Sequence, residues 1–544
     1  MTSDCGSVVS QPVRSRRRVL CVFPSYTSSF GTFEYAYALR GGVRAFMPPQ
    51  GILVVAAYLP TDWDVRFIDE NIRPARARDF LWADAVFVSG MHIQRRQILD
   101  INRRAHRHNK VTVLGGPSVS AAPDWYKPFD YLHLGELGDG TDRLIAALDA
   151  SCAPPRQQIR FATADRLALT AFPVPAYHLV QLDRYFLASV QFSSGCPYRC
   201  EFCDIPALYG RNPRLKTPKQ LMAELDAIVA QSHLGAVYFV DDNFIGNRKA
   251  ARELLPHLIA WQARNGYPVQ FACEATLNIA KQPDILELMR RAYFCTLFCG
   301  IETPELGALH AMRKDHNAGM PILDAVATLN GYGIEVVSGI ILGLDTDTAE
   351  TPDRIIDFIH RSNIPMLTIN LLEALPRTPL WERLEKEGRL IDGAERESNV
   401  AFRLPHDEVV AMWRRCIRAA YAPEAVYRRF AHNLRHTYPN RIKPEAPNRA
   451  NWANLRKGFR MLRNVIIRVG VLSDYRATFW RMAGPLLRQR DIEPVIHIGL
   501  VAHHLILFAR KAISGQHNAS FYASRARRAA LRRPVRRFRR VTAD

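Results

Sequence analysis

Six short apolar segments between residues 188 and 373 alternate with longer segments of helical periodicity. Strands joined by helix-length crossovers pair in parallel, so six such units predict a partial (β/α)6 barrel of the TIM type. The active site of such a barrel lies at the carboxyl ends of its strands. The predicted strands begin at Ala188, Ala236, Val269, Thr296, Val336 and Leu367.

Acidic and amide side chains stand at the carboxyl ends of these predicted strands. Packing favours apolar residues there, so several acids at one edge indicate a site, although single ones also cap helices or bind water. The residues concerned are Asp241, Asp242, Asn243, Glu274, Glu302 and Glu373.

An open α/β domain is predicted over residues 17–150, where short apolar strands again alternate with helical segments. An open parallel sheet binds its ligand at the strand ends. Gly115, Gly116, Gly135 and Glu136 stand at such ends, and the glycines allow a close backbone approach, although tight turns explain them equally well. The proline-containing segment 151–185 is predicted to be a linker, and residues 186–405 the barrel domain.

Three cysteines follow the first strand of the predicted barrel with the spacing C-x3-C-x2-C: Cys196, Cys200 and Cys203. Three thiols on one loop suit three irons of a cubane and leave the fourth iron open to a small chelating ligand. Structural zinc is the alternative, but zinc prefers four protein ligands, and no nearby Cys or His supplies the fourth. The odd number of thiols and a reducing compartment disfavour a disulfide.

With Phe202 just before the third cysteine, this motif resembles that of the radical S-adenosylmethionine superfamily. The resemblance implies that the three cysteines hold a [4Fe-4S] cluster whose open iron binds S-adenosyl-L-methionine. Reductive cleavage then gives a 5′-deoxyadenosyl radical. It also implies that Phe202 lies near the adenine and that Glu274 and Glu302 contact the methionine or ribose, with Asp242 as a further cofactor-binding candidate.

The open domain in front makes the first 400 residues similar to the cobalamin-binding subfamily of these enzymes. Gly115-Gly116 and Gly135-Glu136 match its strand-end pattern, which implies that they contact cobalamin. The Asp-x-His-x-x-Gly signature is absent, since Phe23-Pro-Ser-Tyr-Thr-Ser-Ser-Phe-Gly follows the first strand instead. Bound cobalamin is therefore expected to lack that histidine ligand, and His92 and His133 are expected to be structural.

A basic, mostly helical extension is predicted over residues 406–544. Residues 401–544 hold 30 Lys and Arg against 8 Asp and Glu, whereas residues 1–400 hold 43 against 44. The apolar stretch 495–509 is too short to span a bilayer but suits a membrane interface or a hydrophobic groove. Nine arginines between Arg525 and Arg540 suit a solvated tail, a nucleic-acid clamp or an anionic lipid surface, and the neighbouring apolar stretch favours lipid over nucleic acid.

The expected location is the cytoplasm, with peripheral contact to the inner face of the cytoplasmic membrane. No signal peptide is predicted at the N-terminus, and no apolar run of about 20 residues predicts a transmembrane helix.

The whole-chain layout, with its Asp241–Asn243 strand end and the segment Leu375-Pro-Arg-Thr-Pro-Leu-Trp, resembles the hopanoid methylases, above all those forming 2-methylhopanoids. The resemblance implies a radical C-methyltransferase acting at C-2 of ring A, with methylcobalamin as methyl donor and a second S-adenosylmethionine to regenerate it. The implied partners are a hopanoid lipid and a reductant of the flavodoxin or ferredoxin type. Three alternatives stay open: a C-3 hopanoid methylase, a tetrapyrrole methylase or cyclase, and an RNA-modifying iron–sulfur protein.

Overall fold

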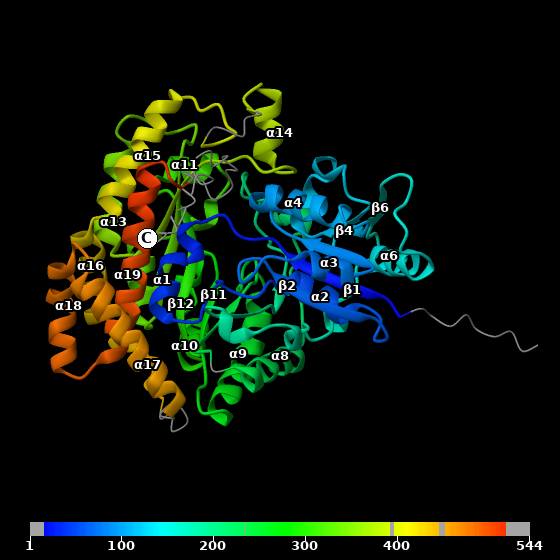
Figure 1. Cartoon of the computed structure of the whole chain (residues 1–544). Helices are drawn as coiled ribbons and strands as arrows, with labels where there is room; N and C mark the ends of the chain where they lie inside the picture. The colour runs from blue at the N-terminus through cyan, green and yellow to red at the C-terminus, as the bar shows by residue number, and fades with distance from the viewer. Residues whose placement is uncertain (1–15, 233, 392–396, 445–451, 518–544) are drawn as a thin grey trace, which may run out of the picture.

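The computed structural model describes residues 16–232, 234–391, 397–444 and 452–517. Two parallel sheets and a set of helices form three neighbouring parts (Figure 1). The first sheet lies on one side of the barrel strands, and the C-terminal helices lie on the other.

The first sheet has six parallel strands in the order β2-β1-β3-β4-β5-β6. Buried apolar clusters cover both of its faces, as in a doubly wound sheet. The strand order reverses between β1 and β3, the point at which such sheets bind their ligands. The strands are β1 (Arg18–Phe23), β2 (Asp64–Asp69), β3 (Ala85–Ser89), β4 (Val111–Gly115), β5 (Tyr131–Leu134) and β6 (Ile159–Ala162), and the main helices are α2 (Gln50–Tyr58), α3 (Ala77–Trp82), α4 (Arg95–His106), α5 (Pro117–Ala121) and α6 (Asp139–Ala150).

Strand β6 lies within the segment 151–185 that the sequence predicts to be a linker. It pairs in parallel with β5, with Tyr131 opposite Ile159. Three of its four residues are exposed, so it lacks the apolar run by which buried parallel strands are recognised. The first sheet therefore extends beyond residue 150.

The second sheet is the predicted partial barrel, with six parallel strands in the order β14-β13-β12-β11-β10-β7. Strands β7 and β14 form its two edges, and the α/β fold class predicted from the sequence is confirmed. The strands are β7 (Ala188–Val190), β10 (Ala236–Phe239), β11 (Gln270–Glu274), β12 (Phe294–Glu302), β13 (Glu335–Leu342) and β14 (Met366–Leu371). The connections between them contain α8 (Pro218–Gln231), α9 (Arg248–Arg264), α10 (Pro283–Arg291), α11 (Leu306–Ala311), α12 (Ile322–Gly331) and α13 (Thr351–Ser362), and α14 (Pro379–Lys386) follows the last strand.

The helical extension forms a layer against the barrel, which we call the C-terminal helical layer. It comprises α15 (His406–Ala420), α16 (Pro423–His436), α17 (Trp452–Val465), a π-helical continuation (Ile466–Val471), α18 (Arg476–Arg488) and α19 (Ile492–Ile513). Helix α15 packs on β14, where the indole of Trp413 donates to the carbonyl of Ile369 at 2.8 Å. The Arg525–Arg540 tail lies outside the described residues.

Helix α19 contains the apolar stretch 495–509. Among the described residues it is the one helix whose length and composition would allow it to cross a membrane, yet 67% of its most apolar window is buried inside the protein. It packs against α1 (Glu34–Arg40), α16, α17 and α18. Most of the apolar surface of this stretch is therefore buried against other helices of the chain.

The segment between β1 and α2 leaves the first sheet and reaches the C-terminal helical layer. Its 3-10 turn (Phe30–Thr32) places the Phe30 ring 4.8 Å from that of Tyr421, and the Phe30 carbonyl lies 2.9 Å from Nε2 of His504. This is the segment where the absent histidine signature would stand. Here it joins the N-terminal and C-terminal parts of the chain.

Candidate functional site

The three cysteines lie on one loop, residues 195–210, which we call the cysteine loop. A short antiparallel pair, β8 (Ser193–Ser194) and β9 (Arg214–Leu215), brackets it, and α7 (Ile205–Leu208) lies within it. The amide of Cys196 donates to the carbonyl of Gly210 at 3.2 Å. Gly195 has φ +102°, and a Cβ there would lie 2.9 Å from that same carbonyl oxygen, so the neck of the loop requires glycine.

The thiols of Cys196, Cys200 and Cys203 are close enough to repel one another when charged. Burial raises the pKa of all three, and the neighbouring thiols raise those of Cys200 and Cys203 further. Among the described residues, no three His, Cys, Asp or Glu side chains converge on one point that would hold a single metal ion. Neighbouring thiols spread along a loop fit the separate corners of a cluster better than one zinc ion.

Two acids after β10 hold the base of the cysteine loop. Asp241 accepts hydrogen bonds from the amides of Phe192, at 3.1 Å, and Ser193, at 2.5 Å. Asp242 accepts from the amide of Gly195 at 2.7 Å. Burial raises the pKa of Asp241 to about 6 and that of Asp242 to about 7. The structure thus places Asp242 as a support of the loop.

Glu302 and Lys314 form a buried ion pair, with Oε1 of Glu302 2.5 Å from Nζ of Lys314. The ammonium also lies 5.4 Å from the centre of the Phe202 ring. Burial opposes a charged lysine, but Glu302 and the thiol of Cys200 outweigh it and raise the pKa of Lys314. The pair therefore brings a fixed positive charge to the cysteine loop. Sequence reasoning missed Lys314, because no pattern links it to Glu302.

Glu274 lies at the end of the neighbouring strand β11. Its Oε1 accepts a hydrogen bond from the Tyr238 hydroxyl at 3.2 Å. Burial, together with the charge of Asp242, raises the pKa of Glu274 to about 7. A half-neutral carboxyl group at this edge can either accept or donate a hydrogen bond to a polar ligand.

Two of the three glycines predicted for the first sheet stand at positions of close packing. Gly116 has φ +95°, and a Cβ there would lie 2.6 Å from Oγ of Ser89 on the neighbouring strand. Gly135 has φ +102°, and its Cβ would meet Thr163 at 3.3 Å. Gly115 has only ordinary contacts. A ligand role for these glycines stays a prediction.

Glu136 joins the first sheet to the cysteine loop. Its carboxylate forms ion pairs with Arg214 of β9 and with Arg166, the latter at 3.2 Å, and it accepts from the Ser194 hydroxyl at 3.2 Å. Arg166 donates in turn to the carbonyl of Leu208 at 3.0 Å. Glu136, which is predicted to contact cobalamin, thus forms ion pairs and a hydrogen bond that link the first domain to the cysteine loop. The sequence gives no sign of these contacts.

The two histidines expected to be structural have partners in the first domain. Nε2 of His133 lies 2.9 Å from the Thr141 hydroxyl, and burial lowers its pKa to about 4. His92 lies with Nδ1 3.2 Å from the Ser118 hydroxyl and Nε2 3.8 Å from Asp204, the residue after Cys203. His92 therefore adds a second contact between the first domain and the cysteine loop.

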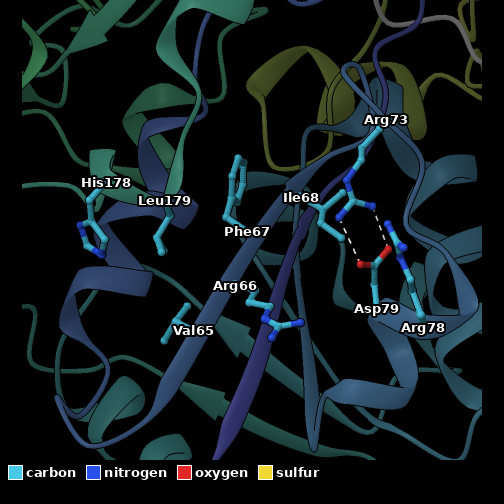
Figure 2. Close-up of a pocket in the computed structure, with 9 residues that line it drawn as sticks. All are labelled: Val65, Arg66, Phe67, Ile68, Arg73, Arg78, Asp79, His178 and Leu179. Atoms are coloured by element: carbon cyan, nitrogen blue, oxygen red, sulfur yellow. Dashed lines mark hydrogen bonds and ion pairs between the residues drawn. The ribbon is translucent and has the colours of Figure 1, made fainter. Parts of the chain in front are cut away.

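A pocket lies on the outer strand β2, away from these residues (Figure 2). Arg66 and Phe67 of β2 line it together with Leu179, and Arg73 forms an ion pair with Asp79 across one wall. None of the residues predicted for the site lines this pocket.

Three family models match consecutive parts of the chain. A B12-binding domain matches residues 38–145, and the radical SAM superfamily matches residues 190–359. A domain of unknown function matches residues 378–518, which include all helices of the C-terminal helical layer.

The chain is 60% identical over 518 residues to the hopanoid C-2 methylase of Rhodopseudomonas palustris, covering 95% of this chain and 98% of that protein. Two solved structures share the fold. The cobalamin-dependent S-adenosylmethionine radical enzyme OxsB, with aqua-cobalamin and S-adenosylmethionine bound, matches 92% of this chain and 80% of its own with a TM-score of 0.58 at 13% identity. The radical S-adenosylmethionine methyltransferase TsrM of Kitasatospora setae, with cobalamin and a [4Fe-4S] cluster bound, matches 77% of this chain and 96% of its own with a TM-score of 0.56 at 16% identity.

Proposed function

Because this chain belongs to the hopanoid C-2 methylase family of cobalamin-binding radical S-adenosylmethionine enzymes, we propose that it adds a methyl group to C-2 of ring A of hopanoid lipids. The identity to the Rhodopseudomonas palustris enzyme carries this proposal, because it extends through both cofactor domains and into the helical layer. A shared fold alone would leave the substrate open.

The enzyme uses a [4Fe-4S] cluster, S-adenosyl-L-methionine and cobalamin. When bound, these groups supply the radical that removes hydrogen from an unactivated carbon and the methyl group that replaces it. Cys196, Cys200 and Cys203 provide the thiolates for the cluster. The hydrogen bond from the Cys196 amide to the Gly210 carbonyl closes the loop that carries them, next to Gly195.

The strand-end side chains divide into supports and ligand contacts. Asp242 holds the amide of Gly195 and so positions the cysteine loop. Glu274 and Glu302 offer carboxyl groups at adjacent strand ends for the polar groups of S-adenosylmethionine. Lys314 supplies positive charge beside the thiolates, which lowers the free energy of gathering three negative sulfurs in a buried loop.

The first domain adds the second cofactor surface. Gly115, Gly116 and Gly135 offer backbone at the ends of β4 and β5, where an open parallel sheet binds its ligand. Glu136 holds that edge against β9 and thereby brings the cobalamin domain to the cysteine loop. This contact supports the proposal that the two cofactor surfaces lie on neighbouring parts of one site, as methyl transfer to a substrate radical requires.

The partners follow from the proposed reaction. A hopanoid is an apolar lipid, so the enzyme is proposed to work in the cytoplasm at the inner membrane surface and to take electrons from a flavodoxin-type or ferredoxin-type protein. The observation in favour is the basic C-terminal part of the chain, which suits an anionic lipid surface.

The test is lipid mass spectrometry in a hopanoid-producing bacterium that makes no methylated hopanoids. This chain is expressed beside its Cys203→Ala variant, with Cys416→Ala as the matched control. Cys416 is a buried cysteine of α15, outside the cysteine loop. New hopanoids heavier by one CH₂ are expected with the wild type and with Cys416→Ala, and none with Cys203→Ala.

Chromatographic retention against 2-methyl and 3-methyl standards then places the methyl group. A product at C-3 would overturn the proposed position while keeping the reaction class. No product from protein shown to hold cluster and cobalamin would overturn the substrate, and the same purified protein would then be assayed on tetrapyrroles and RNA.

A further inference from the structure

Exposed apolar side chains gather on the outer part of the C-terminal helical layer. Seven of them, which we call the α17–α18 patch, lie within 29 residues of chain: Trp452, Leu455, Phe459, Ile467, Val471, Leu472 and Trp480. The side chains of Trp452, Phe459 and Leu472 are 82%, 69% and 72% exposed, respectively. Single exposed apolar residues are common on proteins, but seven of them along three consecutive helical segments indicate a contact surface.

The patch is part of a well-packed element. In α17 the spacing of Trp452, Leu455 and Phe459 places them on one side of the helix. Val465 is fully buried, and the Asn464 amide donates to the carbonyl of Leu39 in α1 at 3.0 Å. The inner face of α17 is therefore packed against the protein, whereas its apolar outer face is exposed.

Close packing continues through the π-helical turn. A Cβ on Gly470 would lie 3.0 Å from the Trp480 ring, and the Trp480 indole donates to the Gly470 carbonyl at 2.8 Å. These contacts hold the π-helical continuation of α17 against α18. Figure 1 shows both helices at the edge of the molecule opposite the first sheet.

Positive charge accompanies the patch. Residues 452–490 contain nine Lys and Arg and a single acid, Asp474. That acid is paired with Arg510 at 2.8 Å, so it does not offset the bases of the patch. On α17, Arg456, Arg460 and Arg463 are exposed beside the apolar stripe. An apolar stripe bordered by arginines is the pattern of a helix that lies in the interface of an anionic bilayer.

We propose that the α17–α18 patch is the membrane-docking surface of this protein, with Trp452 and Phe459 inserted at the level of the upper acyl chains. Arg456, Arg460 and Arg463 contact the lipid phosphates. This inference rests on the proposed function only in that a bilayer holds the hopanoid. It moves the membrane contact away from α19, whose apolar residues are buried.

Charge argues against the other occupants of the patch. A second copy of this chain would bring Arg456, Arg460 and Arg463 to face the same three arginines. The segment that follows residue 517 carries nine arginines between Arg525 and Arg540, so it too is repelled by the patch and attracted to the same anionic surface.

The test measures binding of the full-length protein to vesicles of phosphatidylcholine alone and of phosphatidylcholine with 30% phosphatidylglycerol, by flotation. The variant Trp452→Ser/Phe459→Ser is compared with Leu81→Ser/Leu306→Ser, which removes two exposed apolar side chains from other parts of the surface. A loss of about tenfold or more is expected for the first pair and none for the second. Thermal unfolding confirms that all variants fold.

The charge contribution is tested with Arg456→Gln/Arg460→Gln/Arg463→Gln on the same vesicles. Loss of about fivefold per arginine is expected with phosphatidylglycerol present. Binding of Trp452→Ser/Phe459→Ser equal to wild type would overturn the proposal. The proposal would also be overturned if sedimentation velocity showed a dimer for the wild type and a monomer for this variant. The patch would then be the contact between two copies of the chain.

Methylation assays separate this inference from the proposed function. The docking variants should methylate detergent-dispersed hopanoid at the wild-type rate and vesicle-bound hopanoid slowly. Failure of all methylation, with wild-type vesicle binding intact, would remove the proposed function and leave the docking surface standing.

Discussion

Nζ of Lys314 lies 2.5 Å from Oε1 of Glu302 in the interior of the barrel, where both side chains are buried. The pair joins the end of β12 to the loop after α11 and faces the cysteine loop through Phe202. A buried charge that loses its partner is strongly destabilising, whereas an intact pair is close to neutral.

Replacing Lys314 with Met should therefore lower the free energy of unfolding by about 3–5 kcal/mol, because Glu302 keeps a buried, unpaired carboxylate. Lys314→Met/Glu302→Leu should recover most of this loss. Urea denaturation of the three proteins measures it. If the double variant is as unstable as the single one, the charge imbalance is not the cause.

Lys314→Met should also change the midpoint potential of the cluster, which is a separate effect from its change in stability. Without the ammonium near Cys200, the midpoint potential of the cluster should become more negative, since a nearby cation favours the reduced, more negative state. A redox titration followed by electron paramagnetic resonance measures this potential. Lys314→Arg keeps the charge and serves as the control, and an unchanged potential in Lys314→Met would contradict the assignment.

Gly300→Ala should disturb the same ion pair from the backbone side. A Cβ at residue 300 would lie 2.2 Å from Oε1 of Glu302 and 2.8 Å from Nζ of Lys314. Overpacking of this kind costs about 1–3 kcal/mol, and S-adenosylmethionine affinity should fall with it. Gly307→Ala in α11 is the matched control, because its Cβ meets nothing within 4 Å. Calorimetry with the ligand and thermal unfolding give both readouts.

Glu136→Gln should weaken the contact between the first domain and the cysteine loop. Arg214 and Arg166 would lose their carboxylate partner, and Nε and Nη1 of Arg214 are already buried without hydrogen-bond partners. We expect faster amide hydrogen exchange over residues 193–215 and faster loss of iron to a chelator. Asp124→Asn, which breaks the exposed pair with Arg160, should leave both rates unchanged. Equal exchange in both variants would show that Glu136 does not hold the loop.

Acid should loosen the contact between the N-terminal segment and the C-terminal helical layer. Burial lowers the pKa of His504 to about 3, whereas an unfolded histidine titrates near about 6.5. Below about pH 6.5 the unfolded chain binds a proton that the folded protein rejects, so this contribution to stability is complete above about pH 6.5 and declines between about pH 6.5 and 3.

Urea denaturation between pH 7.5 and 4.5 measures this effect against His504→Gln, which removes the titrating group and keeps a donor for the Phe30 carbonyl. The variant should lose stability less steeply with falling pH, by up to about 1.4 kcal/mol per pH unit. Parallel curves for the two proteins would assign the acid sensitivity to other groups.

The sequence alone determined the two parallel α/β domains, the helical extension and the cysteine loop. These features can be predicted from short segments of sequence, since apolar periodicity, crossover length and the C-x3-C-x2-C spacing depend on neighbouring residues only. Strand β6 is not predicted in this way, because its residues are mostly exposed and it is recognised as a strand only by its pairing with β5.

Tertiary structure decided which partners the site residues have. The interacting pairs are far apart in the sequence: the separation is 12 residues for Glu302 and Lys314, 78 for Glu136 and Arg214, and 474 for Phe30 and His504. It also buried the apolar stretch of α19 and left the face of α17 exposed, although both are apolar in sequence. Ion pairing and burial are set by distance in space, and the order of residues along the chain does not fix that distance until the chain has folded.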